Sequence, residues 1–165
     1  MSKIEISQEV QEILNGINRQ DNVKQIVVSL EGDKLLMPYT KEEQKKNRGK
    51  LVAALRSGEY QQCRGLLKTK LGHCCLGVGC EIFANEVGGE FLINQNNIFT
   101  FFIGLNKNHV YLPSEVMDYF GFRTNDGAWG SDSENQSLAN LNDNGATFLE
   151  IADIIEAEPE GLCVK

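Results

Sequence analysis

The segment GHCCLGVGCEIF, residues 72–83, decides how the rest of the chain is interpreted. It contains three of the five cysteines and one of the two histidines. Its apolar and small residues recur at helical spacing, so we predict a helix over residues 74–85. Gly88 after it is the expected stop signal. Glycine weakens an isolated helix, and Gly77 and Gly79 therefore predict that this helix packs closely against neighbouring backbone.

The thiols and the imidazole of this segment admit three interpretations. A thiol at a helix N-terminus has a lowered pKa, so Cys74 or Cys75 with His73, oriented by Asp143 or Asn142, are candidate catalytic residues. A zinc site would use the same groups, but the spacing contains no C-x-x-C pair and we predict no metal. We favour the third interpretation, burial as small apolar side chains, because cysteine is among the most buried residue types. We therefore expect no cofactor and favour a protein that is not an enzyme.

The remaining hydrophobic pattern predicts one compact α+β domain with several short helices and a small antiparallel sheet. We predict that residues 1–40 form an N-terminal helix and hairpin, added to a core domain at residues 41–165. We expect the helix at 74–85 to pack against the C-terminal helix. The predicted helices lie at 7–17, 40–58, 114–120, 138–141 and 148–156, the predicted strands at 23–30, 34–37, 91–93, 98–103 and 109–112, and the predicted turns and loops at 94–97, 106–108 and 123–136.

Charge divides the chain into a basic and an acidic part. The net charge is -7, yet residues 41–70 hold nine basic and three acidic side chains, whereas residues 111–165 hold two basic and eleven acidic ones. The two parts attract each other, bind different partners, or are simply solvated faces. Basic side chains beside the glycine-rich segment suit a phosphate, and the Asn142–Gly145 turn is either structural or functional. The candidate ligand-binding residues are Arg56, Tyr60, Arg64, Lys68, Asn142 and Asp143.

Composition narrows the setting in which the protein acts. No apolar run approaches the ~18 residues that a membrane-spanning helix needs, so we expect no membrane partner. The N-terminus is polar and acidic, unlike a signal or transit peptide. Five cysteines, two of them adjacent, do not form an even disulfide framework, which predicts reduced thiols in the cytoplasm.

Four groups of segments form a recognisable combination. They are LVAALRSG at 51–58 with Tyr60, CCLGV at 74–78 followed by Cys80 and Glu81, Leu112 and Pro113 with Val116, and LANLND-x-G-x-x-F-x-x-IAD at 138–153. Together they resemble a family of small, mostly uncharacterised proteins from phages and bacteria. The resemblance spans roughly residues 50–156 and implies a phage or prophage accessory protein acting inside a bacterial cell. No activity is assigned to that family, so the resemblance implies no reaction.

These observations predict a non-catalytic phage-type accessory protein that binds a host protein or a small nucleotide ligand in the bacterial cytoplasm. The alternative is a cysteine-dependent hydrolase or transferase that uses Cys74 or Cys75 with His73. We do not expect nucleic acid as a partner, since a basic stretch of ordinary density is more often solvated. The oligomeric state stays open.

Overall fold

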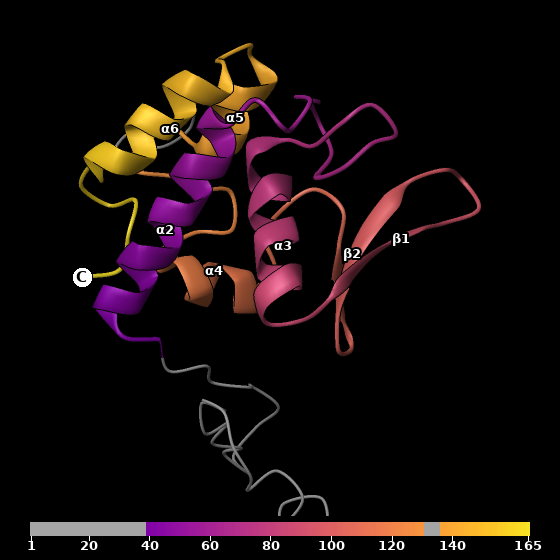
Figure 1. Ribbon diagram of the computed structural model, residues 1–165, viewed down its shortest axis with the longest axis horizontal. Helices are drawn as coiled ribbons and strands as arrows, with labels where there is room; N and C mark the ends of the chain where they lie inside the picture. Colours follow the sequence, from indigo (N-terminus) through magenta and orange to yellow (C-terminus); the bar gives the residue numbers. More distant parts are fainter. Residues whose placement is uncertain (1–38, 131–135) are drawn as a thin grey trace, which may run out of the picture. The chain divides into compact units, whose positions relative to one another are not determined.

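The computed structural model describes residues 39–130 and 136–165 (Figure 1). These residues form five helices and one three-stranded antiparallel sheet, which confirms the predicted α+β class. The helix at 7–17, the strands at 23–30 and 34–37, and nearly all of the N-terminal addition lie outside this part and stay predictions. The elements are α2 (Lys41–Arg56), α3 (Cys75–Glu86), β1 (Glu90–Ile93), β2 (Phe99–Ile103), β3 (Asn106–Asn108), α4 (Ser114–Phe120), α5 (Leu138–Asp143) and α6 (Phe148–Ala157).

Local sequence signals fix where the helices begin. In α2 the Thr40 hydroxyl accepts a hydrogen bond from the Glu43 backbone N–H at 3.2 Å, and the Glu43 carboxylate accepts from the Thr40 N–H at 3.0 Å. Thr147 and Glu150 make the same reciprocal pair at the start of α6. Each pair satisfies two backbone donors that a helix start leaves without partners. Gly121, with a φ of 70°, ends α4 as its position predicts.

Seven of the twelve residues of helix α3 are buried, and the helix contacts α2, α4 and α5. A Cβ added to Gly77 would lie 1.7 Å from the Leu67 carbonyl oxygen, and one added to Gly79 would lie 3.1 Å from the Phe120 ring. Only glycine leaves room for neighbours at these distances. The predicted close approach of backbone to this helix is therefore confirmed.

The predicted packing of α3 against the C-terminal helix is wrong. Helix α6 packs along α2 instead, and in Figure 1 the two helices run beside each other. The Arg56 guanidinium at the end of α2 holds α6 there, at 2.5 Å from Asp153 and 2.8 Å from Glu156. Helix α5, rather than α6, packs beside α3, and its Leu138 carbonyl accepts a hydrogen bond from the Cys75 thiol.

The sheet has the order β1-β2-β3, and its first two strands agree with the predicted ones at 91–93 and 98–103. The third strand is displaced, because Asn106–Asn108 pairs with β2 where a turn was predicted. The predicted strand at 109–112 is wrong for a local reason. The Asn108 side-chain oxygen accepts hydrogen bonds from the next three backbone N–H groups, at 2.9, 3.0 and 3.0 Å, and so turns the chain out of the ladder.

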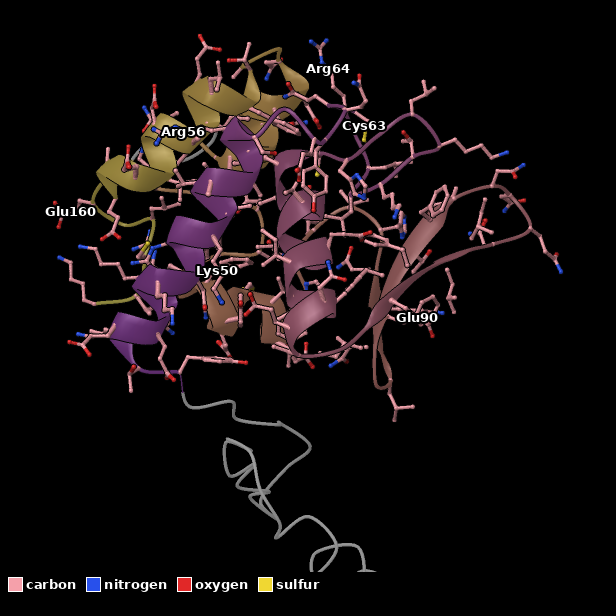
Figure 2. All side chains as sticks on the ribbon, viewed as in Figure 1. Lys50, Arg56, Cys63, Arg64, Glu90 and Glu160 are labelled. Atoms are coloured by element: carbon pink, nitrogen blue, oxygen red, sulfur yellow. The ribbon has the colours of Figure 1, made fainter. Side chains whose placement is uncertain are left out.

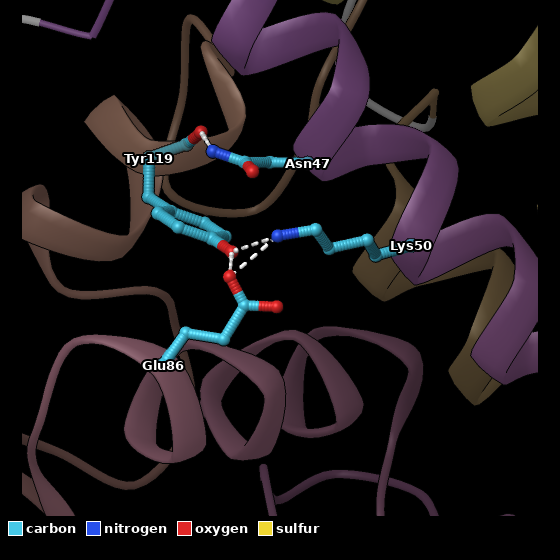
Figure 3. Close-up of polar contacts among 4 residues, drawn as sticks. All are labelled: Asn47, Lys50, Glu86 and Tyr119. Carbon is cyan, nitrogen blue, oxygen red and sulfur yellow. Dashed lines mark hydrogen bonds and ion pairs between the residues drawn. The ribbon is translucent and has the colours of Figure 1, made fainter. Parts of the chain in front are cut away.

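One polar cluster joins α2, α3 and α4 (Figure 3). The Glu86 carboxylate accepts a hydrogen bond from the Tyr119 hydroxyl at 2.7 Å and one from the Lys50 ammonium at 2.5 Å. Asn47 donates to the Tyr119 carbonyl at 2.9 Å. Burial, and then the hydrogen bond to Glu86, raises the pKa of Tyr119, which therefore stays protonated and remains a donor. The three helices are thus linked by charge-assisted hydrogen bonds as well as by their apolar core.

The two helical glycines Gly77 and Gly49 test the close packing of α3. We expect Gly77→Ala to lower the free energy of unfolding by about 2 kcal/mol or more, because the new methyl group overlaps the Leu67 carbonyl. Gly49→Ala in α2 meets no atom within 4 Å and should raise it by about 0.5–1 kcal/mol. Urea unfolding followed by circular dichroism measures both changes, and equal stability of Gly77→Ala and wild type would contradict this contact.

Candidate functional site

The N-terminus of α3 is a junction of distant segments. Cys74 is the N-cap of the helix, and its sulfur accepts a hydrogen bond from the Gly77 backbone N–H at 3.3 Å. The Asn142 side chain from α5 reaches the same helix end and accepts from the Cys75 N–H at 3.2 Å. Segments about 70 residues apart in sequence therefore satisfy the first N–H groups of α3 together.

Asn142 is fully buried, and its whole amide is engaged within the protein. Its oxygen also accepts from Gln62 at 2.9 Å, and its nitrogen donates to the Cys63 carbonyl at 2.8 Å and to Asp143 at 3.1 Å. With the bond from Cys75, this makes two donated and two accepted hydrogen bonds, the full capacity of an amide. Its contacts are those of a structural residue that holds the 61–73 loop, α3 and α5 together.

A cavity of about 320 Å³ lies beside this junction. Two carboxylates, Asp126 and Asp143, a hydroxyl and an amide make much of its wall polar. The Tyr111 ring, 42% exposed, contributes an aromatic side chain. None of the described lining residues is a lysine, an arginine or a histidine. The described residues that line the cavity are Gly65, Leu66, Cys74, Val110, Tyr111, Asp126, Ser137, Ala139, Asn140 and Asp143.

Hydrogen bonds between lining segments hold the cavity wall in place. The Asp143 carboxylate accepts from the Gly65 N–H at 2.9 Å, and the Asp126 carbonyl accepts from the Ala139 N–H at 3.1 Å. Ser137 caps α5 by accepting from the Asn140 N–H at 3.1 Å. In the described part of the chain the Asp126 carboxylate makes no hydrogen bond or ion pair. The site is therefore preorganised around one acceptor group whose hydrogen-bonding capacity is unused.

The cysteines of the candidate catalytic set are buried thiols. Burial raises the pKa of Cys74 to about 12, against the opposing hydrogen bond from Gly77, and raises the pKa values of Cys75 and Cys80 well above 9.0. The lowered pKa expected for a thiol at a helix N-terminus does not occur, because desolvation outweighs the helix end. Cys74 lines the cavity but is only 5% exposed.

His73 belongs to a different cluster from the cavity. Its ring makes edge contacts with Tyr60 at 5.5 Å and Phe91 at 6.0 Å, and Nε2 lies 3.8 Å from the Glu81 carboxylate with no hydrogen-bond partner. Burial, and then the nearby Lys68 ammonium, lowers the pKa of His73. The imidazole is therefore neutral near pH 7 and forms no hydrogen bond with Cys74 or Cys75.

The six predicted ligand-binding residues separate into three groups. Tyr60 and Lys68 lie in the His73 cluster, where the Lys68 ammonium is 3.1 Å from Glu81. Arg56 and Asn142 serve contacts between helices and loops. Of the six, only Asp143 lines the cavity. Arg64 directly precedes Gly65, another lining residue.

Arg64 is exposed and lies at the edge of the site. A Cβ added to Gly145 would be 3.2 Å from its guanidinium, and the next residue, Gly65, lines the cavity. Figure 2 shows Arg64 projecting outward near α5, whereas Arg56 lies between α2 and α6. Arg64 is therefore a basic side chain at the edge of the cavity.

Sequence reasoning missed Tyr111, Asp126, Ser137 and Asn140. The signal for Asp126 was the polar 123–136 loop, since long loops on a rigid scaffold often carry binding residues. Across residues 39–130 and 136–165 no group of three or more His, Cys, Asp or Glu side chains is placed to hold a metal ion.

Comparison with known proteins gives one match. A family model described as a domain of unknown function (DUF8296) matches residues 43–159, which is most of the chain. No curated protein and no solved structure matches. The helices seen in the described ranges are all too short or too polar to cross a bilayer.

The buried amide of Asn142 can be tested with an isosteric change. We expect Asn142→Asp to lower the free energy of unfolding by about 3 kcal/mol or more, because it replaces two donors with a buried carboxylate beside Asp143. Asn96→Asp in the exposed β1–β2 turn is the matched control and should change it by less than about 0.5 kcal/mol. Chemical denaturation measures both, and similar losses would contradict the structural role of Asn142.

Thiol alkylation tests the burial of the α3 sulfurs. At pH 7.5 we expect iodoacetamide to modify the half-buried Cys63 and Cys163 first and to leave Cys74, Cys75 and Cys80 unmodified. Raising the pH towards 12 should increase the rate at Cys74, since only the thiolate reacts.

Peptide mass spectrometry locates the modified sites, and labelling in denaturant is the control in which all five thiols react. Fast, selective modification of Cys74 or Cys75 in the native protein would contradict their burial.

Proposed function

We propose a function for this chain, which belongs to the DUF8296 family of domains of unknown function. It is a non-catalytic phage-type accessory protein that binds a small nucleotide in the bacterial cytoplasm. The observation that carries the proposal is the preorganised polar cavity beside the α3 N-terminus. The phage origin and the bacterial setting are supported by the motifs at 74–78 and 138–153. Of the two expected partners, a host protein and a nucleotide, a cavity of this size favours the small ligand.

A nucleotide matches the composition of the cavity. The Tyr111 ring offers a face for stacking against a base, and the Asp126 carboxylate can bind donors at a base edge. Arg64 at the rim can bind a phosphate. Apolar Leu66 and Val110 complete a site that suits a flat, polar aromatic group.

Binding without chemistry follows from the state of the candidate catalytic groups. With a pKa of about 12, the Cys74 thiolate fraction at pH 7 is on the order of 10⁻⁵. His73, the base expected from the sequence, contacts Tyr60, Phe91 and Glu81 instead and makes no hydrogen bond to the thiol in the described part of the chain. A nucleophile without thiolate character or an adjacent base has no means of activation.

The cysteine-dependent hydrolase or transferase is the second candidate, since Cys74 lines the same cavity. It requires a bound substrate to lower the thiol pKa by several units, for example by bringing a positive charge against the sulfur. Product formation from a bound nucleotide, abolished by Cys74→Ala, would favour this candidate over binding alone.

A thermal-shift series tests the nucleotide proposal. A nucleotide at about 100 times its Kd stabilises the folded state by about 2.7 kcal/mol, so we expect a rise in Tm of about 5 °C or more for at least one member of a purine and pyrimidine panel. Asp126→Asn and Tyr111→Ala should remove most of that rise.

Glu90→Gln is the matched control, because it removes one negative charge from exposed strand β1, away from the cavity lining (Figure 2). Its Tm rise should equal that of wild type. A panel that leaves the wild-type Tm unchanged at millimolar concentration would overturn the proposal.

A further inference from the structure

We propose that the cavity takes the base of the nucleotide, leaves the phosphates outside, and selects bases that carry an exocyclic amino group, namely adenine, guanine or cytosine. This inference rests on the proposed function and specifies which part of the ligand is recognised. It follows from the charge of the lining, the unused carboxylate of Asp126, the stacking face of Tyr111 and the position of Arg64.

The charge of the lining excludes phosphate from the interior. Asp126 and Asp143 both line the cavity, and the described lining residues include no basic side chain to offset them. A phosphate group carries about -1.5 to -2 charge at pH 7, and two carboxylates in the same small space repel it. The same carboxylates attract a neutral base that presents N–H donors.

The Asp126 carboxylate gives the site its preference among bases. It is half-buried, makes no hydrogen bond or ion pair within the described ranges, and when ionised can only accept hydrogen bonds. An exocyclic amino group supplies the donors that such a group needs. Uracil and thymine place carbonyl oxygens on both sides of their single N–H, so their lone pairs would face the carboxylate. A ligand that leaves an acceptor of the cavity without a hydrogen bond binds much more weakly than a close analogue that supplies the donor.

Tyr111 is the aromatic side chain available for stacking. It lines the cavity and is 42% exposed, and its own backbone is fixed by the bond to Asn108. The Tyr60 ring, expected from sequence to bind the ligand, is already packed against the His73 imidazole at 5.5 Å. Stacking on Tyr111 tolerates any base, so it adds affinity while Asp126 provides the selection.

Arg64 sets where the phosphates lie. Its guanidinium is exposed beside Gly145, and in the described part of the chain it forms no ion pair. The other basic candidates are already neutralised, Arg56 by Asp153 and Glu156, and Lys68 by Glu81. One exposed cation in water binds a phosphate weakly, so phosphates contribute little to affinity.

Isothermal titration calorimetry of the full chain tests this inference with adenosine, guanosine, cytidine, uridine and thymidine and with their 5′-monophosphates. We expect at least one amino-bearing nucleoside to bind about tenfold or more tighter than uridine and thymidine. Adding a 5′-phosphate should change its Kd by less than about tenfold.

Matched variants separate the contributions of base and phosphate. Asp126→Asn should remove the preference for amino-bearing bases, whereas Glu90→Gln keeps it. Arg64→Gln should weaken monophosphates and leave nucleosides unchanged, whereas Lys70→Gln, in the same exposed loop, changes neither. Tyr111→Ala should weaken all five nucleosides about tenfold and Tyr111→Phe should restore them, which tests the site even where Asp126→Asn fails to fold.

Two results would overturn the inference while leaving nucleotide binding intact. The first is equal affinity for uridine and the amino-bearing nucleosides. The second is binding of monophosphates with no binding of nucleosides, which would place the phosphate at the centre of recognition. If no nucleoside and no nucleotide binds, both the inference and the proposed function are wrong.

Discussion

The close approach between the first turn of α3 and the loop before it governs the arrangement of the site. The Leu67 carbonyl oxygen lies where a Cβ of residue 77 would be, at 1.7 Å, and the Gln61 carbonyl bears the same relation to Gly72 at 2.0 Å. Backbone hydrogen bonds hold this arrangement, with Cys74 N–H donating to Leu67 at 3.0 Å. Two glycines thus permit a loop to lie directly on a helix end, and no larger residue would fit.

This contact explains why the sulfur-rich segment is scaffold rather than chemistry. Once the loop covers the helix end, the thiols of Cys74 and Cys75 lose water, and desolvation raises their pKa values beyond what the helix N-terminus can lower. The first N–H groups of α3 are then satisfied by Cys74 itself and by Asn142. The cavity lies next to this sealed junction, where α5 and the loops meet, so the rigid part supports the polar part.

The sequence predicted what local interactions decide. The starts of α2 and α6 and the ends of α4 depend on residues a few positions apart, and the predicted ranges agree with the structure there. The strand at 109–112 failed because one side chain, Asn108, competes with the ladder for three backbone donors. The cavity could not be predicted, because Tyr111 and Asp126 are distant in sequence and their segments are brought together by tertiary contacts such as the hydrogen bond from the Leu112 N–H to the Asn125 carbonyl. Asp143 was identified because it belongs to the same turn as Asn142.

Basic and acidic side chains that lie far apart in the sequence form ion pairs in the fold. Arg48 binds Glu158 at 2.8 Å and Arg56 binds two acids of α6, so the basic helix α2 and the acidic C-terminal segment attract each other. The exposed pairs of Arg56 add little stability, whereas Arg48 is buried, and both guanidinium groups are occupied by carboxylates rather than available to a phosphate. Arg64 takes no part in these ion pairs, because it lies on the loop beyond α2, beside Gly145. Among the described lining residues the charged side chains, Asp126 and Asp143, are both acidic, and the proposed recognition there therefore relies on hydrogen-bond donors of the ligand rather than on phosphate.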